Sequence, residues 1–97
     1  MKTTTYEALV ALERHTGIIR IMLILLDETE VNFQRFIDDF NFSSTTLYRT
    51  ISQLKSIDLV KSRVDNSSYP ARNMISLTPK GKRVAELLKK IEEVLES

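Results

Sequence analysis

The chain has 97 residues, 42% of them hydrophobic, and this length suits a single domain that buries about 60–65% of its unfolded surface. It contains no cysteine, which excludes disulfides, thiolate metal sites and thiol catalysis, and its single histidine argues against a zinc or iron site. The net charge is only +1, but residues 45–83 carry eight basic and two acidic side chains between two acidic ends. Such a basic middle can form the local positive surface that phosphate binding needs.

Helical periodicity marks the first part of the chain. A helix is predicted at about residues 5–15, and Gly17 is a natural break after it. A second helix at about 18–26 has the most apolar sequence and is expected to lie at the centre of the core. Its apolar run is far shorter than the ~20 residues that cross a bilayer, and the N-terminus lacks the pattern of a signal peptide. We therefore expect a cytoplasmic protein without a membrane segment.

Two further helices are predicted on either side of a short turn. Asn32 is a good N-cap for a helix at 33–40, in which apolar side chains recur at steps of three and four residues, and Val31 before it is assigned as a single strand residue. After a turn at 41–42, the next helix is predicted at 44–57.

Beyond residue 58 the pattern changes from helix to strand. Residues 59–64 and 73–77 read as two strands, joined at 65–71 by a segment rich in turn-forming residues. Thr78 and Pro79 are an N-cap and a first-turn proline, so a last helix is predicted from 79 to about 96. The predicted fold is mainly α with a small β-hairpin: one winged helix-turn-helix domain over residues 1–97.

The helix at 44–57 opens on small hydroxyl residues, Ser43 to Thr46, which are indifferent helix formers. One hydroxyl is expected to be the N-cap. On a helical wheel at ~100° per residue, the inward face consists of Leu47, Ile51 and Leu54. The opposite face bears Arg49 and short hydrogen-bonding groups, with no carboxylate, and it is interpreted as a surface for the DNA major groove. The alternative is a plain capped surface helix.

The residues of this helix predicted to contact DNA are Ser44, Thr45, Thr46, Tyr48, Arg49, Ser52, Gln53 and Lys55.

Residues 17–64, GIIRIMLILLDETEVNFQRFIDDFNFSSTTLYRTISQLKSIDLVKSRV, resemble the helix-turn-helix core of archaeal and bacterial winged-helix regulators. Residues 69–81, YPARNMISLTPKG, resemble the wing and following helix start of the HxlR and MarR groups, whose pattern is a proline or charged loop, an arginine, a strand and Leu-Thr-x-x-Gly. The resemblance covers about residues 17–90. It implies that Ser67, Ser68, Tyr69 and Arg72 lie along or in the minor groove. Arg63 is predicted, with Arg72, to act on phosphates or the minor groove.

The chain departs from both groups in ways that matter for regulation. It has neither the N-terminal cysteine nor the tryptophan near the second helix that the HxlR group usually has. The Asp-x-Arg wing motif of the MarR group is absent, because Asp65 is followed by Asn66 and Ser67. Redox sensing and a MarR-type ligand pocket therefore do not carry over.

The terminal helices, at 1–16 and 84–97, are predicted to form a homodimer. The last helix carries an apolar stripe over about four turns, and its second half extends past so small a body. The residues predicted to form the dimer contact are Tyr6, Leu9, Val10, Leu88, Ile91, Val94 and Leu95.

Other candidates are weaker. His15 is interpreted as a helix-end or interfacial histidine, Asp38 and Asp39 as a solvated face, and Tyr69 either stacks on a sugar or covers Pro70. No catalytic constellation, cofactor or metal site is predicted, and no effector is identified. The sequence thus favours a dimeric, sequence-specific regulator that binds double-stranded DNA. The rivals are a protein-interaction module and an architectural DNA-binding protein without sequence preference.

Overall fold

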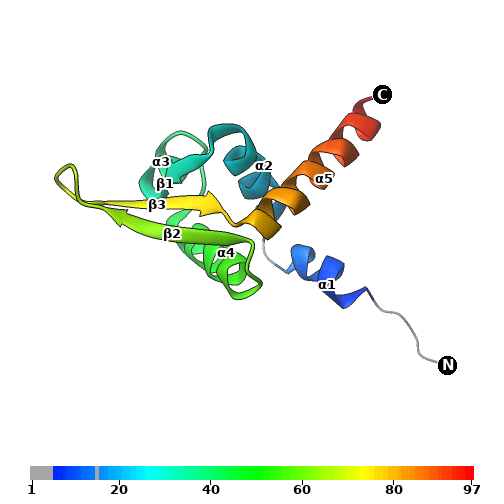
Figure 1. The fold of residues 1–97 in the computed structure, drawn as a ribbon, viewed down its shortest axis with the longest axis horizontal. Helices are drawn as coiled ribbons and strands as arrows, with labels where there is room; N and C mark the ends of the chain where they lie inside the picture. Colours follow the sequence, from blue (N-terminus) through cyan, green and yellow to red (C-terminus); the bar gives the residue numbers. More distant parts are fainter. Residues whose placement is uncertain (1–5, 15) are drawn as a thin grey trace.

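The computed structural model describes residues 6–14 and 16–97. In chain order its elements are α1 (Glu7–Val10), the 3₁₀ helix η1 (Ala11–Glu13), α2 (Ile18–Glu28), β1 (Glu30–Asn32), α3 (Phe33–Asp38), α4 (Ser44–Ser56), β2 (Val60–Asp65), β3 (Arg72–Leu77) and α5 (Pro79–Glu96). The predicted winged helix-turn-helix is confirmed: α2, α3 and α4 precede a long hairpin of β2 and β3, and α5 follows it (Figure 1). The molecule is elongated, 56 × 32 × 25 Å, with the hairpin loop and the end of α5 pointing in different directions.

The core is built around α2, as its apolar sequence predicts. Ile18, Ile21, Met22 and Leu25 recur at helical spacing and are almost completely buried. The inward face predicted for α4 is also confirmed, because Leu47, Ile51 and Leu54 join the same cluster. Helix α5 packs on α2 and adds Ala85 and Leu88.

The sheet has three antiparallel strands in the order β1-β3-β2. The strand residue predicted at Val31 is therefore the middle of a three-residue strand that is paired in this sheet. In β1, Glu30 pairs with Ser76 and Val31 with the buried Ile75 of β3. These partners lie more than forty residues along the chain from β1, so no local alternation in the sequence reveals the pairing. The consequence is that the hairpin is joined directly to the segment between α2 and α3.

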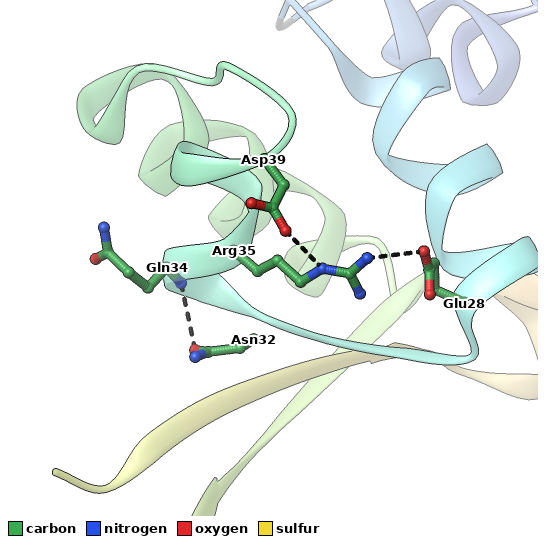
Figure 2. Close-up of polar contacts among 5 residues, drawn as sticks. All are labelled: Glu28, Asn32, Gln34, Arg35 and Asp39. Carbon is green, nitrogen blue, oxygen red and sulfur yellow. Dashed lines mark hydrogen bonds and ion pairs between the residues drawn. The ribbon is translucent and has the colours of Figure 1, made fainter.

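A polar network fixes α3 against the end of α2 (Figure 2). The Asn32 side chain accepts a hydrogen bond from the Gln34 amide, which confirms the predicted N-cap. The Arg35 guanidinium joins Glu28 of α2 and Asp39, each at 3.0 Å. These two carboxylates raise the pKa of Arg35 through their hydrogen bonds, Glu28 first.

Helix α3 ends at Asp38, two residues before the predicted end. Asn41 has a φ of 61°, in the left-handed region that asparagine tolerates better than most residues. The chain therefore turns, and the Phe42 amide donates to the Phe36 carbonyl at 3.2 Å. The Phe36 and Phe42 rings meet edge to face at 5.8 Å, and this packing closes the turn between the two helices.

Helix α1 is much shorter than the predicted helix at 5–15. The two end residues of that prediction, Thr5 and His15, lie outside the described part of the chain. The described segment forms four α-helical residues and one 3₁₀ turn, and α1 itself has no buried residue. A short helix is marginal without packing; Leu9 and Val10 of α1 are exposed, whereas Ala11 of η1 is buried.

The start of α5 lies directly against the start of β2. Thr78 caps the helix, because its Oγ1 accepts from the Gly81 amide at 2.9 Å and donates to the Asp58 carbonyl at 2.6 Å. A Cβ placed on Gly81 would lie 1.9 Å from the Leu59 carbonyl oxygen, so only glycine permits this approach. In the described residues, no helix is both long and apolar enough to cross a membrane.

Candidate nucleic-acid interface

Helix α4 is fixed at both ends by its own sequence. The Ser43 hydroxyl accepts from the Thr46 amide at 3.2 Å, which confirms that one hydroxyl of the cluster is the cap. At the other end Asp58 is left-handed, with φ 61°, and the Leu59 amide donates to the Leu54 carbonyl at 2.9 Å. This is the Schellman arrangement, in which two apolar residues also pack across the turn.

A buried hydroxyl anchors α4 to the start of α2. Thr50 is completely buried, and its Oγ1 donates to the Thr16 carbonyl at 3.0 Å. Thr50 was not among the predicted inward residues, although it lies three residues after Leu47 and four before Leu54, at the spacing of the inward face. Its hydrogen bond, together with the buried Leu47, Ile51 and Leu54, holds this face of α4 inward.

The outer face of α4, defined as the eight predicted DNA-contacting residues, is well separated from the core. Thr46 and Gln53 are half-buried and the other six are exposed: Ser44, Thr45, Tyr48, Arg49, Ser52 and Lys55. Tyr48, Arg49, Ser52 and Gln53, together with Ser56, line a shallow hollow. Within the described residues, neither Arg49 nor Lys55 takes part in an ion pair. This face therefore offers unneutralised positive charge and free hydrogen-bonding groups.

The wing is defined as β2, β3 and residues 66–71, and the loop at its far end projects away from the helices (Figure 1). The Asp65 carboxylate accepts from the Ser67 amide at 2.9 Å, and the Ser67 hydroxyl and then its amide lower the pKa of Asp65. The Tyr69 ring is fully exposed, so it does not cover Pro70, and the peptide bond between them is cis. Ser68 is half-buried, and its hydroxyl finds no partner in the described residues.

The two wing arginines are in different states. Arg72 is exposed and forms no ion pair with any described residue. Arg63 is held by Glu30 of β1, with Nε to Oε2 at 2.8 Å and Nη2 to Oε1 at 2.7 Å. The hydrogen bonds from Arg63 lower the pKa of Glu30, and those to Glu30 raise the pKa of Arg63. Glu30 is a polar residue of the site that sequence reasoning missed.

The terminal apolar residues separate into two groups. Six of the predicted dimer residues are exposed: Tyr6, Leu9, Val10, Ile91, Val94 and Leu95. Leu88 is only 9% exposed and belongs to the core of its own domain, so it leaves little surface for the proposed dimer contact. The stripe on α5 thus divides between an inner face at Ala85 and Leu88 and an outer face from Leu87 to Leu95.

Solved structures of transcription regulators share this fold. The redox regulator HypR has a TM-score of 0.80 at 16% identity, with 96% of this chain and 95% of that chain covered. A transcriptional regulator homologue from Pyrococcus horikoshii OT3 has a TM-score of 0.74 at 20% identity, with 89% and 85% covered. A MarR-family regulator from Porphyromonas gingivalis W83 has a TM-score of 0.73 at 15% identity, with 96% and 94% covered. No curated protein sequence matches the chain.

The fold and its α4 surface define the class: a winged helix-turn-helix of the kind found in DNA-binding transcription regulators. Within that class, residues 4–61 match the Mga helix-turn-helix domain, and the chain belongs to that family. The matched segment includes α2, α3 and α4 and ends as β2 begins.

Proposed function

We propose that this protein is a transcription regulator that binds a specific double-stranded DNA sequence as a homodimer, with α4 in the major groove and the wing along the backbone or minor groove. The observation that carries the proposal is the outer face of α4, whose residues are exposed or half-buried and include no carboxylate, and on which Arg49 forms no ion pair with any described residue. Carboxylates would be repelled by phosphates, and their absence is what a DNA-facing helix requires.

The side chains of this face suit base recognition. An arginine can donate two hydrogen bonds to a guanine edge, and serine and threonine hydroxyls bond to bases or phosphates. Short side chains such as Ser44 and Thr45 at the first turn also let the helix backbone approach the groove closely. Its N-terminal amides favour a nearby phosphate. A plain surface helix accounts for the cap at Ser43 but not for the whole polar face.

The dimer proposal rests on the outer apolar residues of α1 and α5. The charges on α5 add an orientation, because Lys89 and Lys90 precede Ile91 and Glu92 and Glu93 follow it. If two copies of α5 pair antiparallel around Ile91, the lysines of each copy lie opposite the glutamates of the other. A two-fold dimer would then present two α4 helices to successive major grooves, about 34 Å apart.

Selection of bound duplexes from a random-sequence pool tests the function. A regulator should enrich one pseudo-palindrome with two half-sites about 10 base pairs apart. An architectural protein should bind with a steep salt dependence but enrich no sequence. An interaction module should retain no DNA even at low salt, and that result would refute the proposal.

A further inference from the structure

The outer face of the sheet carries a contact between the wing and the helix-turn-helix. Glu30 lies opposite Ser76 of β3, while Arg63 lies opposite Met74, which is two residues nearer the hairpin loop along β3. The two side chains meet across β3, the central strand. Arg63 therefore extends toward β1 and the base of the wing rather than toward the loop at 66–71.

This contact changes what Arg63 can offer to DNA. Both Nε and Nη2 of its guanidinium are committed to the Glu30 carboxylate, and the pair has no net charge. Arg72, in contrast, pairs with Asp65 only as a strand neighbour and forms no ion pair in the described part of the chain. The wing thus has one arginine available to a polyanion and one that is neutralised.

The remaining charged groups of this face do not replace the carboxylate. Lys61 lies across Ser76 from Glu30, and Asp65 lies two residues beyond Arg63, but neither forms an ion pair with Glu30 or Arg63 among the described residues. The side chains of Arg63 and Glu30 are 56% and 29% exposed, so the pair sits at the surface, where exchange of partners is possible. A surface ion pair contributes little stability, so its loss should leave the fold intact.

We propose that Glu30 is an affinity-setting residue: it holds Arg63 in an internal ion pair and so restrains binding of the wing to DNA phosphates. The inference rests on the proposed function. Removing the carboxylate frees the guanidinium and also removes a negative charge that repels phosphate. If Glu30 instead positioned Arg63 for a phosphate, removing it would weaken binding, so the sign of the effect decides between the two roles.

The test compares Glu30→Gln with Asp27→Asn, which makes the same change in net charge on the exposed end of α2. Binding to a labelled 30-base-pair duplex of mixed sequence is followed by fluorescence anisotropy as salt is varied. One phosphate contact contributes about 0.9 to the slope of log affinity against log salt. Glu30→Gln should therefore steepen the slope by about 0.9 and tighten binding on the order of fivefold to tenfold at 0.1 M salt. Asp27→Asn should leave the slope unchanged.

Arg63→Gln in both backgrounds completes the test. It should abolish the steeper salt slope of the Glu30→Gln protein and leave the salt slope of the wild-type protein unchanged. Glu30→Thr, which suits a strand, should repeat the gain, and thermal melts report whether each variant folds. Weaker binding of folded Glu30 variants, or a flatter slope for Arg63→Gln alone, would overturn the inference and leave the proposed function standing. If the wild-type protein shows no salt-dependent binding, both are refuted.

Discussion

The outer face of α4 and the outer face of the sheet look equally basic in the sequence but differ in the folded protein. On α4, Arg49 and Lys55 stand among hydroxyl and amide groups. On the sheet, Asp65 lies opposite Arg72, and Glu30 reaches Arg63 from a strand more than thirty residues away. The comparison teaches that a count of basic residues does not measure the charge that a surface presents to DNA. That charge depends on which carboxylates the fold brings beside them.

The largest expected effect comes from breaking the proposed dimer, because each monomer then binds DNA with only one α4 and one wing. Changing Ile91 and Leu95 together to lysine puts like charges into the proposed dimer contact and should give monomers that bind half-sites. Because linked sites gain avidity, affinity for a full site should fall on the order of 100-fold. Sedimentation at micromolar concentration measures the oligomeric state.

The matched control for this variant is Glu86→Gln with Glu96→Gln, which adds the same positive charge without touching the apolar stripe. It should remain a dimer. A wild-type protein that sediments as a monomer, or a double-lysine variant that stays dimeric, would contradict the dimer proposal.

The next effect concerns α4 alone. Arg49→Ala should cost about 1–3 kcal/mol of binding to the selected site if the side chain reads a guanine. Thermal stability should be unchanged, because Arg49 lies on the face opposite Leu47 and Ile51. Arg83→Ala removes an exposed cation from α5 and serves as the control. Equal affinities for wild type and Arg49→Ala, with equal stability, would remove Arg49 from the interface.

A smaller effect is expected from the available arginine of the wing. Arg72→Gln should weaken all duplexes alike and flatten the salt slope by about 0.9, the contribution of one phosphate. The measurement is anisotropy on the selected and a scrambled duplex. A change in sequence preference with an unaltered slope would instead assign Arg72 to base readout.

The smallest effect comes from comparing a threonine on the inward face of α4 with one on its outer face. Thr50→Val keeps the side-chain shape but removes the hydrogen bond to the Thr16 carbonyl. Unfolding free energy should fall by about 1 kcal/mol, measured by urea denaturation. Thr45→Val, on the outer face, should leave stability nearly unchanged and weaken DNA binding. The reverse pattern would mean that the two faces of α4 are assigned the wrong way round.

Local sequence signals predicted much of this fold. Caps at Asn32 and Thr78 placed two helix starts correctly, the start predicted at residue 44 was right, and apolar spacing identified the inward face of α4. What the sequence could not supply was the result of long-range contact. The pairing of β1 with β3 depends on residues far along the chain, so it left only a hint at Val31.

The candidate site divides in the same way. The outer face of α4 follows from helical geometry and was predictable residue by residue. The state of Arg63 was not, because its partner Glu30 lies in a strand that the sequence did not reveal. The burial of Leu88 was not predictable either, because one apolar stripe on α5 serves both the core and the exposed surface.

In the proposed dimer, the contact at Gly81 would influence the distance between the two DNA half-sites. Helix α5 has 18 residues and is therefore about 27 Å long, and near its start it lies against the Leu59 carbonyl at Gly81. A tilt of about 10° at this pivot would carry the far end of such a rod about 5 Å. In the proposed dimer, the distance between half-sites would thus depend on Gly81, a position that has no side chain.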